Sequence, residues 1–298
     1  MIEIKDIFES YSSKMVQIHL YQRAMKDLAT KELKELYKYE QSLEENPELK
    51  EFSYSSHNMA FRSAKEGTAV FFGSKKITTE ERKLAVILHK NKQYQWLLAE
   101  AYEEFEDFLE NIYAYAGFKN HNFWPLRDYG NISLEDLKLK PLTWFEEQAK
   151  KKKDIPSSII NKFRESFPKI ADIEIKNGLE VNLRFVLVLI EFLRHVIVHK
   201  GGTVSDKEEF IKRVLQKAGV YNNGKPNEKY ITDINAYFGD SEYKNTIVLI
   251  EVSVDSGSPV DTYVNVFDIL SGYLMAYAHL ICESLSNSHN KKINSDHK

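Results

Sequence analysis

One apolar segment constrains the fold of this chain more than any other feature. Residues 183–193 are almost all apolar, and they follow Gly178 and precede the pair Gly201-Gly202. A helix that is apolar on nearly all of its sides is typical of the middle of a helical bundle. The segment therefore predicts a buried helix from about Leu179 to His199, which ends at the glycine pair.

Four further segments show the spacing of apolar residues that is typical of helices. The expected helices cover residues 3–46, 78–115, 206–218 and 263–285. By contrast, residues 246–254 are short and β-branched, which favours a strand or small hairpin. Because only 12 glycines and 7 prolines punctuate 298 residues, long helices fit this chain better than a strand-and-turn architecture.

The expected fold class is mainly α, with a short β element near residues 245–255. We expect residues 1–77 to form an N-terminal helical extension and residues 78–286 to form the main helical domain. Residues 287–298 are polar and are expected to be a disordered tail. Residues 50–77 match neither the helical nor the strand spacing of apolar residues well, apart from a short apolar run before Gly73.

Net charge and cysteine content narrow the classes of function. A net charge of −3 gives no global attraction for nucleic acid, so any contact with RNA requires a local basic patch. The single Cys282 excludes an intrachain disulfide, and we expect it to be a buried structural thiol. The N-terminal residues do not resemble a signal peptide, and no segment has the roughly 18 to 20 apolar residues of a membrane span, which predicts a cytoplasmic protein without membrane contact.

The end of the buried helix carries the most reactive group of side chains in the sequence. Arg194, His195 and His199 fall within six positions there, and Lys200 follows them. Arginine holds phosphate in a forked set of hydrogen bonds, and histidine carries protons near neutral pH. The combination predicts a site that cleaves or binds a phosphodiester, although both Arg194 and His199 could instead bond carbonyls at the helix end.

A metal site is the alternative use of the two histidines. His195 and His199 are four residues apart and share a helix face, as two zinc ligands often do. The zincin pattern requires Glu after the first histidine, but Val196 stands there, and no third ligand is evident. We therefore predict no metal and no cofactor.

The spacing of Arg194 and His199 determines whether both side chains can contact one phosphate. The two residues are about 140° apart on an ideal helix, at roughly 100° per residue. They meet at one phosphate only if the helix loosens before Gly201, or if a second subunit completes the site. The second possibility predicts a homodimer with composite active sites.

The segment from Arg194 to His199 resembles the signature of the HEPN superfamily (higher eukaryotes and prokaryotes nucleotide-binding domains). That signature is an Arg, a polar residue, three variable residues and a His, at the end of an apolar helix. His195 stands where most members have Asn or Asp, and Gly201 stands where some toxin members have Tyr. The resemblance covers about residues 78–286 and implies a helical bundle of HEPN type.

The resemblance implies a metal-independent endoribonuclease that works as a dimer, often in phage defence or toxin action. His199 would serve as general acid or base, Arg194 would bind the phosphate, and His195 would orient the pair or contact phosphate. The products would be a 2′,3′-cyclic phosphate and a 5′-hydroxyl. Some members of the superfamily only bind nucleotides or partners, so a non-catalytic binding or dimerisation module is the alternative.

Two charged runs are further candidates for function. Lys150, Lys151, Lys152 and Lys153 form the only dense basic run, which either contacts RNA together with Lys200 or is a solvated loop. The second run is acidic and lies in the helix expected from residue 78. Its carboxylates either take part in acid–base chemistry or form a solvated face; they are Glu103, Glu104, Glu106, Asp107 and Glu110.

Overall fold

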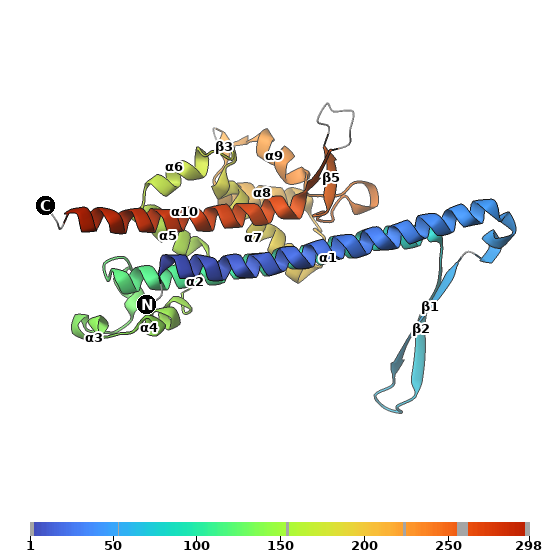
Figure 1. Cartoon of the computed structure of the whole chain (residues 1–298), viewed down its shortest axis with the longest axis horizontal. Helices are drawn as coiled ribbons and strands as arrows, with labels where there is room; N and C mark the ends of the chain where they lie inside the picture. The colour runs from blue at the N-terminus through green and yellow to red at the C-terminus, as the bar shows by residue number, and fades with distance from the viewer. Residues whose placement is uncertain (1–2, 53, 153–154, 223–224, 255–261, 296–298) are drawn as a thin grey trace. The chain divides into compact units, whose positions relative to one another are not determined.

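The structure is a computed structural model of the chain and describes residues 3–52, 54–152, 155–222, 225–254 and 262–295. Ten α-helices account for most of these residues, which confirms the prediction of a mainly α fold (Figure 1). The helices are α1 (Ile4–Glu45), α2 (Thr79–Lys119), α3 (Leu134–Lys138), α4 (Leu142–Ala149), α5 (Ser157–Ser166), α6 (Lys169–Ile175), α7 (Leu183–Lys200), α8 (Lys207–Ala218), α9 (Glu228–Asn235) and α10 (Val266–Ser295). Within the described residues, no helix has both the length and the apolar character that crossing a membrane requires.

The remaining regular elements are short. The described residues contain three antiparallel pairs of strands, and the two strands of each pair are consecutive in the chain. They are β1 (Ser55–Arg62) with β2 (Ala69–Ile77), β3 (Tyr221–Asn222) with β4 (Lys225–Pro226), and β5 (Glu251–Val254) with β6 (Thr262–Asn265). The 3-10 helices are η1 (Pro47–Phe52), η2 (Leu126–Tyr129) and η3 (Ser241–Tyr243). Strand β5 confirms the β element expected near residues 245–255.

The chain divides into two compact units. One contains Met1–His19 and Gln95–Lys298, and the other contains Leu20–Tyr94. The boundary expected after residue 77 therefore falls inside the second unit. That unit keeps its two helical arms together because Ala29 and Leu36 of α1 share an apolar cluster with Val86 of α2.

Four element boundaries differ from those expected. Helix α7 begins at Leu183 and not near Leu179, because Asn182 caps its first turn. Helix α2 continues past Gly117 to Lys119, because the absence of a side chain at Gly117 leaves room for the ring of Trp124. Residues 263–265, expected to be helical, belong to β6, and α10 begins at Val266. The tail expected from residue 287 is helical as far as Ser295, since neither Gly nor Pro interrupts α10 there.

Helix α7 is the buried helix that the apolar segment predicts. It packs against α6, α8 and α10, and Leu189, Leu193 and Ile197 are fully buried along it. Asn182 caps its first turn by accepting a hydrogen bond from the backbone N–H of Phe185. Burial of this length of apolar surface is the main stabilising contribution that the helix makes.

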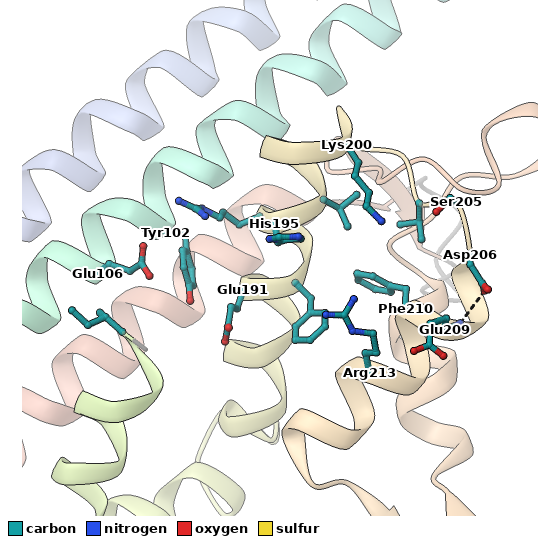
Figure 2. Close-up of a pocket in the computed structure, with 15 residues that line it drawn as sticks. Tyr102, Glu106, Glu191, His195, Lys200, Ser205, Asp206, Glu209, Phe210 and Arg213 are labelled. Carbon is teal, nitrogen blue, oxygen red and sulfur yellow. Dashed lines mark hydrogen bonds between the residues drawn. The ribbon is translucent and has the colours of Figure 1, made fainter. Parts of the chain in front are cut away.

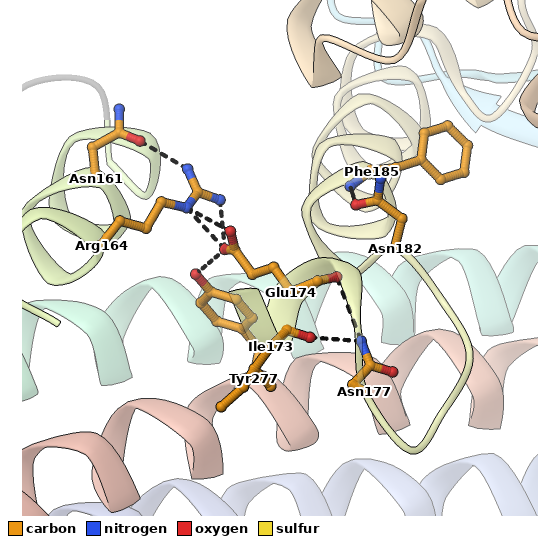
Figure 3. A network of polar contacts seen from close by, with 8 residues as sticks. All are labelled: Asn161, Arg164, Ile173, Glu174, Asn177, Asn182, Phe185 and Tyr277. Atoms are coloured by element: carbon orange, nitrogen blue, oxygen red, sulfur yellow. Dashed lines mark hydrogen bonds and ion pairs between the residues drawn. The ribbon is translucent and has the colours of Figure 1, made fainter. Parts of the chain in front are cut away.

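A network of buried polar groups joins three helices of the larger unit (Figure 3). Arg164 of α5 donates from Nε to both carboxylate oxygens of Glu174 of α6, at 2.9 Å each. Tyr277 of α10 also donates to Glu174, whose side chain is almost wholly buried. Every charged group of this network therefore has a partner, which is the condition for burying an ion pair without a large net cost.

The glycine pair fixes the end of α7. Gly201 and Gly202 have φ of 65° and 85°, and the N–H of Gly202 donates to the carbonyl of Val196 at 3.1 Å. Gly202 lies so close to Gln95 of α2 that a Cβ atom there would overlap the Gln95 amide. The same amide donates to the carbonyl of Ile247 at 2.7 Å, so one side chain joins α2, the end of α7 and the segment before β5.

Replacing Glu174 with Gln is expected to lower the free energy of unfolding by about 3 kcal/mol, because the Arg164 guanidinium would lose its buried counter-charge. Denaturant unfolding of the wild-type and variant proteins measures the change. Glu165→Gln is the matched control, since Glu165 is an exposed residue of α5. An equal effect of both substitutions would contradict the role given to the network.

Replacing Gly202 with Ala is expected to destabilise the protein by about 1–3 kcal/mol, because the new Cβ meets Gln95 and the positive φ strains any other residue. Gly272→Ala in α10 should stabilise the protein, since nothing lies within 4 Å of a Cβ there and alanine favours a helix. Thermal unfolding of both variants gives the comparison. A stable Gly202→Ala variant would show that α7 does not need this contact.

Candidate functional site

A cavity of about 350 Å³ lies beside the C-terminal half of α7 (Figure 2). Its walls come from α2, α7, the loop after α7, and α8, with Ile155 from the segment before α5. Arg194, His195 and Lys200, three of the site residues predicted from sequence, are among the side chains that line it. The cavity therefore joins the predicted motif to charged residues of two other helices.

One end of the cavity is cationic. Lys200, His195 and Arg213 face one another across it (Figure 2). The Arg213 guanidinium lies over the ring of Phe192, 5.4 Å from its centroid. Within the described residues, neither Lys200 nor Arg213 has a carboxylate partner in an ion pair. Asp206 and Glu209 line the same side of the cavity, but neither is ion-paired with Lys200 or Arg213, so this end offers two cations to a phosphate group.

The two histidines of α7 lie in contact. The ring centroids of His195 and His199 are 4.6 Å apart, and both side chains are exposed. Loss of hydration lowers the pKa of His195, and the charges of His199, Arg213 and Lys200 lower it further. A histidine with a lowered pKa is neutral near pH 7 and is able to accept a proton.

The opposite end of the cavity is rich in hydrogen-bond acceptors. Glu106 of α2 and Glu191 of α7 line it, and Tyr102 lies between them (Figure 2). Burial raises the pKa of Glu106 to about 7, against the opposing effect of Arg194, and burial also raises the pKa of Glu191. The Tyr102 hydroxyl is buried and has no hydrogen-bond partner among the residues that the structure describes. These groups are costly to leave without partners.

Arg194 faces α2 and not His199. Its guanidinium donates to Glu103 at 2.9 Å, and its Nε is buried without a hydrogen-bond partner in the described part of the chain. Helix α7 remains regular to Lys200, so the loosened helix end that would bring Arg194 to His199 is not present. His199 is also not part of the cavity lining. Arg194 and His199 therefore do not form one site within a single chain.

The lysine run contributes little to this site. Lys150 and Lys151 are exposed, and Lys153 lies outside the described residues. Lys152 is an ion-pair partner of Asp128 at 2.5 Å and is largely buried. None of the three described lysines lines the cavity, because the run follows α4 while the cavity is built on α2, α7 and α8.

The sequence does not single out Tyr102, Glu191 or Arg213 as site residues, and for Glu106 it leaves acid–base chemistry and a solvated face as alternatives. A periodic signal for Glu106 was present, because residues 102, 106, 109 and 113 share one face of α2 and the other three are buried. Arg213 could not be found from sequence, since its approach to α7 depends on how α8 folds back.

The geometry also bears on metal binding. Among the residues that the structure describes, no group of three or more His, Cys, Asp or Glu side chains is placed to hold a metal ion. His195 and His199 would provide two ligands of a site, and a structural or catalytic zinc site requires at least three from the protein.

Comparison of the chain with protein-family models, with curated proteins and with solved structures gave no significant match. The resemblance to the HEPN superfamily therefore depends on residues 194–199 and on their place at the end of a buried helix.

The raised pKa of Glu106 predicts a pH-dependent effect of Glu106→Gln. A carboxyl whose pKa is higher in the folded than in the unfolded protein contributes stability at low pH, and that contribution is lost as pH rises from about 4.5 to about 7. The variant should therefore be about 1 kcal/mol more stable than wild type at pH 8, a value reduced by the partial exposure of Glu106, and equal to it near pH 4.5.

Thermal unfolding at both pH values measures this difference. Glu100→Gln is the control, because Glu100 is an exposed carboxylate of the same helix. A Glu106→Gln variant that is destabilised at pH 8 would mean that the carboxylate stabilises the fold rather than opposing it.

Proposed function

We propose that this chain is a metal-independent endoribonuclease. Its proton carriers are His195 and His199, and its phosphate-binding groups are Lys200 and Arg213. The observation that supports this most directly is the contact between two imidazole rings beside two unpaired cations. Two histidines and a cation suffice to transfer a phosphodiester of RNA without a metal, because the 2′-hydroxyl supplies the nucleophile.

The proposed reaction follows from these roles. Neutral His195 removes the proton of the 2′-hydroxyl, and the 2′-oxygen forms a bond to phosphorus. The bond from phosphorus to the 5′-oxygen breaks, and protonated His199 gives its proton to that oxygen. Lys200 and Arg213 balance the negative charge on the non-bridging oxygens. The products are a 2′,3′-cyclic phosphate and a 5′-hydroxyl.

A homodimer forms part of this proposal. The proposed reaction uses residues of one chain, but a site of the HEPN type also joins Arg194 to His199. Because these two residues do not converge within one chain, that site requires a second copy next to α7. Both His195 and His199 are exposed and are therefore accessible to such a copy. Phage defence or toxin action is the biological setting that the family resemblance suggests.

The ion pair between Arg194 and Glu103 favours a second candidate function. If this pair has a structural role, the chain is a non-catalytic module of HEPN type that binds nucleotides or forms dimers. The two candidates differ in one measurable respect, since only the first predicts that RNA is cut.

Purified protein should cleave mixed RNA in the presence of EDTA and leave cyclic phosphate ends. His195→Ala and His199→Ala should each reduce the rate at least 100-fold, because each removes one proton carrier. His89→Ala is the matched control and should cleave at the wild-type rate, since His89 is an exposed histidine of the other compact unit.

Equal cleavage by the wild type and both site variants would assign the activity to a contaminant and contradict the proposal. Absence of cleavage by the wild type would favour the non-catalytic candidate. Cleavage that requires added metal would show that the histidine pair binds a metal ion.

A further inference from the structure

We propose that the acceptor-rich end of the cavity recognises guanine, so that the chain binds and cleaves RNA at guanosine. This inference rests on the proposed function, since it assigns the substrate base of that site. It begins from four polar groups at one end of the cavity that have no hydrogen-bond partner within the described residues. They are the Glu106 and Glu191 carboxylates, the Tyr102 hydroxyl and the Arg194 Nε.

Tyr102 provides the strongest indication that a ligand belongs there. Its side chain is only 2% exposed and lines the cavity, yet no described residue forms a hydrogen bond with its hydroxyl. In Figure 2 this hydroxyl lies between the Glu106 and Glu191 side chains. Buried hydroxyl groups are almost always hydrogen-bonded, so an unpaired one beside a cavity marks a place for an outside partner.

The two carboxylates require donors. Within the described residues, neither Glu106 nor Glu191 has a hydrogen bond or a close ion-pair partner, and burial raises the pKa of both. Elsewhere in the same unit, Glu174 is more deeply buried but is held by Arg164 and Tyr277. The same unit therefore supplies a cation to one buried carboxylate and none to the two in the cavity. This contrast is what a site for a hydrogen-bond donor from outside the protein would show.

Guanine matches this set of groups better than the other three bases. Its Watson–Crick edge has two adjacent donors, N1–H and the N2 amino group, and one acceptor, O6. A carboxylate accepts the two donors together, and the Arg194 Nε or the Tyr102 hydroxyl donates to O6. Uracil has only one donor on this edge, while adenine and cytosine present an acceptor where guanine has N1–H.

The cavity also has the right extent for a nucleotide. Glu191 and His195 are four residues apart on α7, so their Cβ atoms lie roughly 5–6 Å from each other on one helix face. A base held by Glu191 therefore places its sugar and phosphate near His195, Lys200 and Arg213. A volume of about 350 Å³ is within the range of pockets that hold small ligands.

Equilibrium binding of the four nucleoside 3′-monophosphates tests the inference without relying on cleavage. Guanosine monophosphate should bind at least tenfold more tightly than the other three, since one bidentate contact gives roughly 1–3 kcal/mol of discrimination. Inosine monophosphate, which lacks the N2 amino group, should lose most of this preference. A uniform affinity for all four nucleotides, or no binding of any at millimolar concentration, would overturn the inference.

Two variants test which residues give the preference for guanosine. Glu106→Gln and Glu191→Gln should each reduce the ratio of guanosine to uridine affinity at least fivefold, whereas Glu100→Gln should leave it unchanged. The ratio is the proper measure, because removing a carboxylate raises the affinity for every anionic nucleotide. Unchanged binding of uridine monophosphate or better shows that each variant is folded. A preference that survives in both variants would place guanine recognition elsewhere and contradict the proposal.

The two proposals fail in different ways. Guanosine-selective binding without RNA cleavage would contradict the proposed ribonuclease activity and support the proposed base-recognition site. Sequencing of the RNA fragments shows after which bases the protein cuts. Cleavage with equal frequency after all four bases would support the proposed ribonuclease activity and contradict the proposed base-recognition site. The double variant His195→Ala/His199→Ala should keep its guanosine preference in binding while losing cleavage.

Discussion

The contact between Gln95 and Gly202 holds the end of helix α7 against α2. The Gln95 amide occupies the space that a side chain at position 202 would need, and it also donates to the carbonyl of Ile247. The backbone of Gly202 in turn accepts from the N–H of Ile247 at 2.9 Å. Because the last turn of α7 carries His199 and Lys200, these contacts fix the orientation of the cationic end of the cavity.

In the larger unit, some buried charged groups have partners inside the protein and others do not. Arg164, Glu174 and Tyr277 form a closed network in which the charged groups have partners inside the protein. Among the described residues, the Glu106 carboxylate, the Tyr102 hydroxyl and the Arg194 Nε lack such partners, although the Arg194 guanidinium also pairs with Glu103. A closed network contributes to a unique fold, and an open one costs stability unless a ligand completes it. Only the open set is therefore informative about binding.

Much of the helical architecture follows from the sequence. The apolar segment predicts α7, the glycine pair predicts its end, and the pattern of residues 206–218 predicts α8. These predictions succeed because they depend on local spacing and on the conformational preferences of single residues. The hairpin of β1 and β2 was not predicted, since it is exposed on both faces and has no alternation of buried and exposed residues.

The candidate site was predicted only in part. The segment from Arg194 to Lys200 does lie at a cavity, but the direction of Arg194 depends on Glu103, which is 91 positions away in the chain. The sequence leaves Glu106 either in acid–base chemistry or on a solvated face, and its partial burial depends on the packing of α2 beside α7. Contacts between helices distant in sequence leave no local pattern, so residue spacing cannot reveal them.

The single cysteine of the chain has a practical consequence. Cys282 of α10 is buried, and burial raises the pKa of its thiol to about 12. A thiol that stays protonated at neutral pH reacts slowly with maleimides, disulfides and peroxide. A new cysteine placed at an exposed position such as Ser205, on the rim of the cavity, would therefore be labelled selectively in the otherwise native chain. A fluorophore or spin label there would report directly on whether the cavity is occupied.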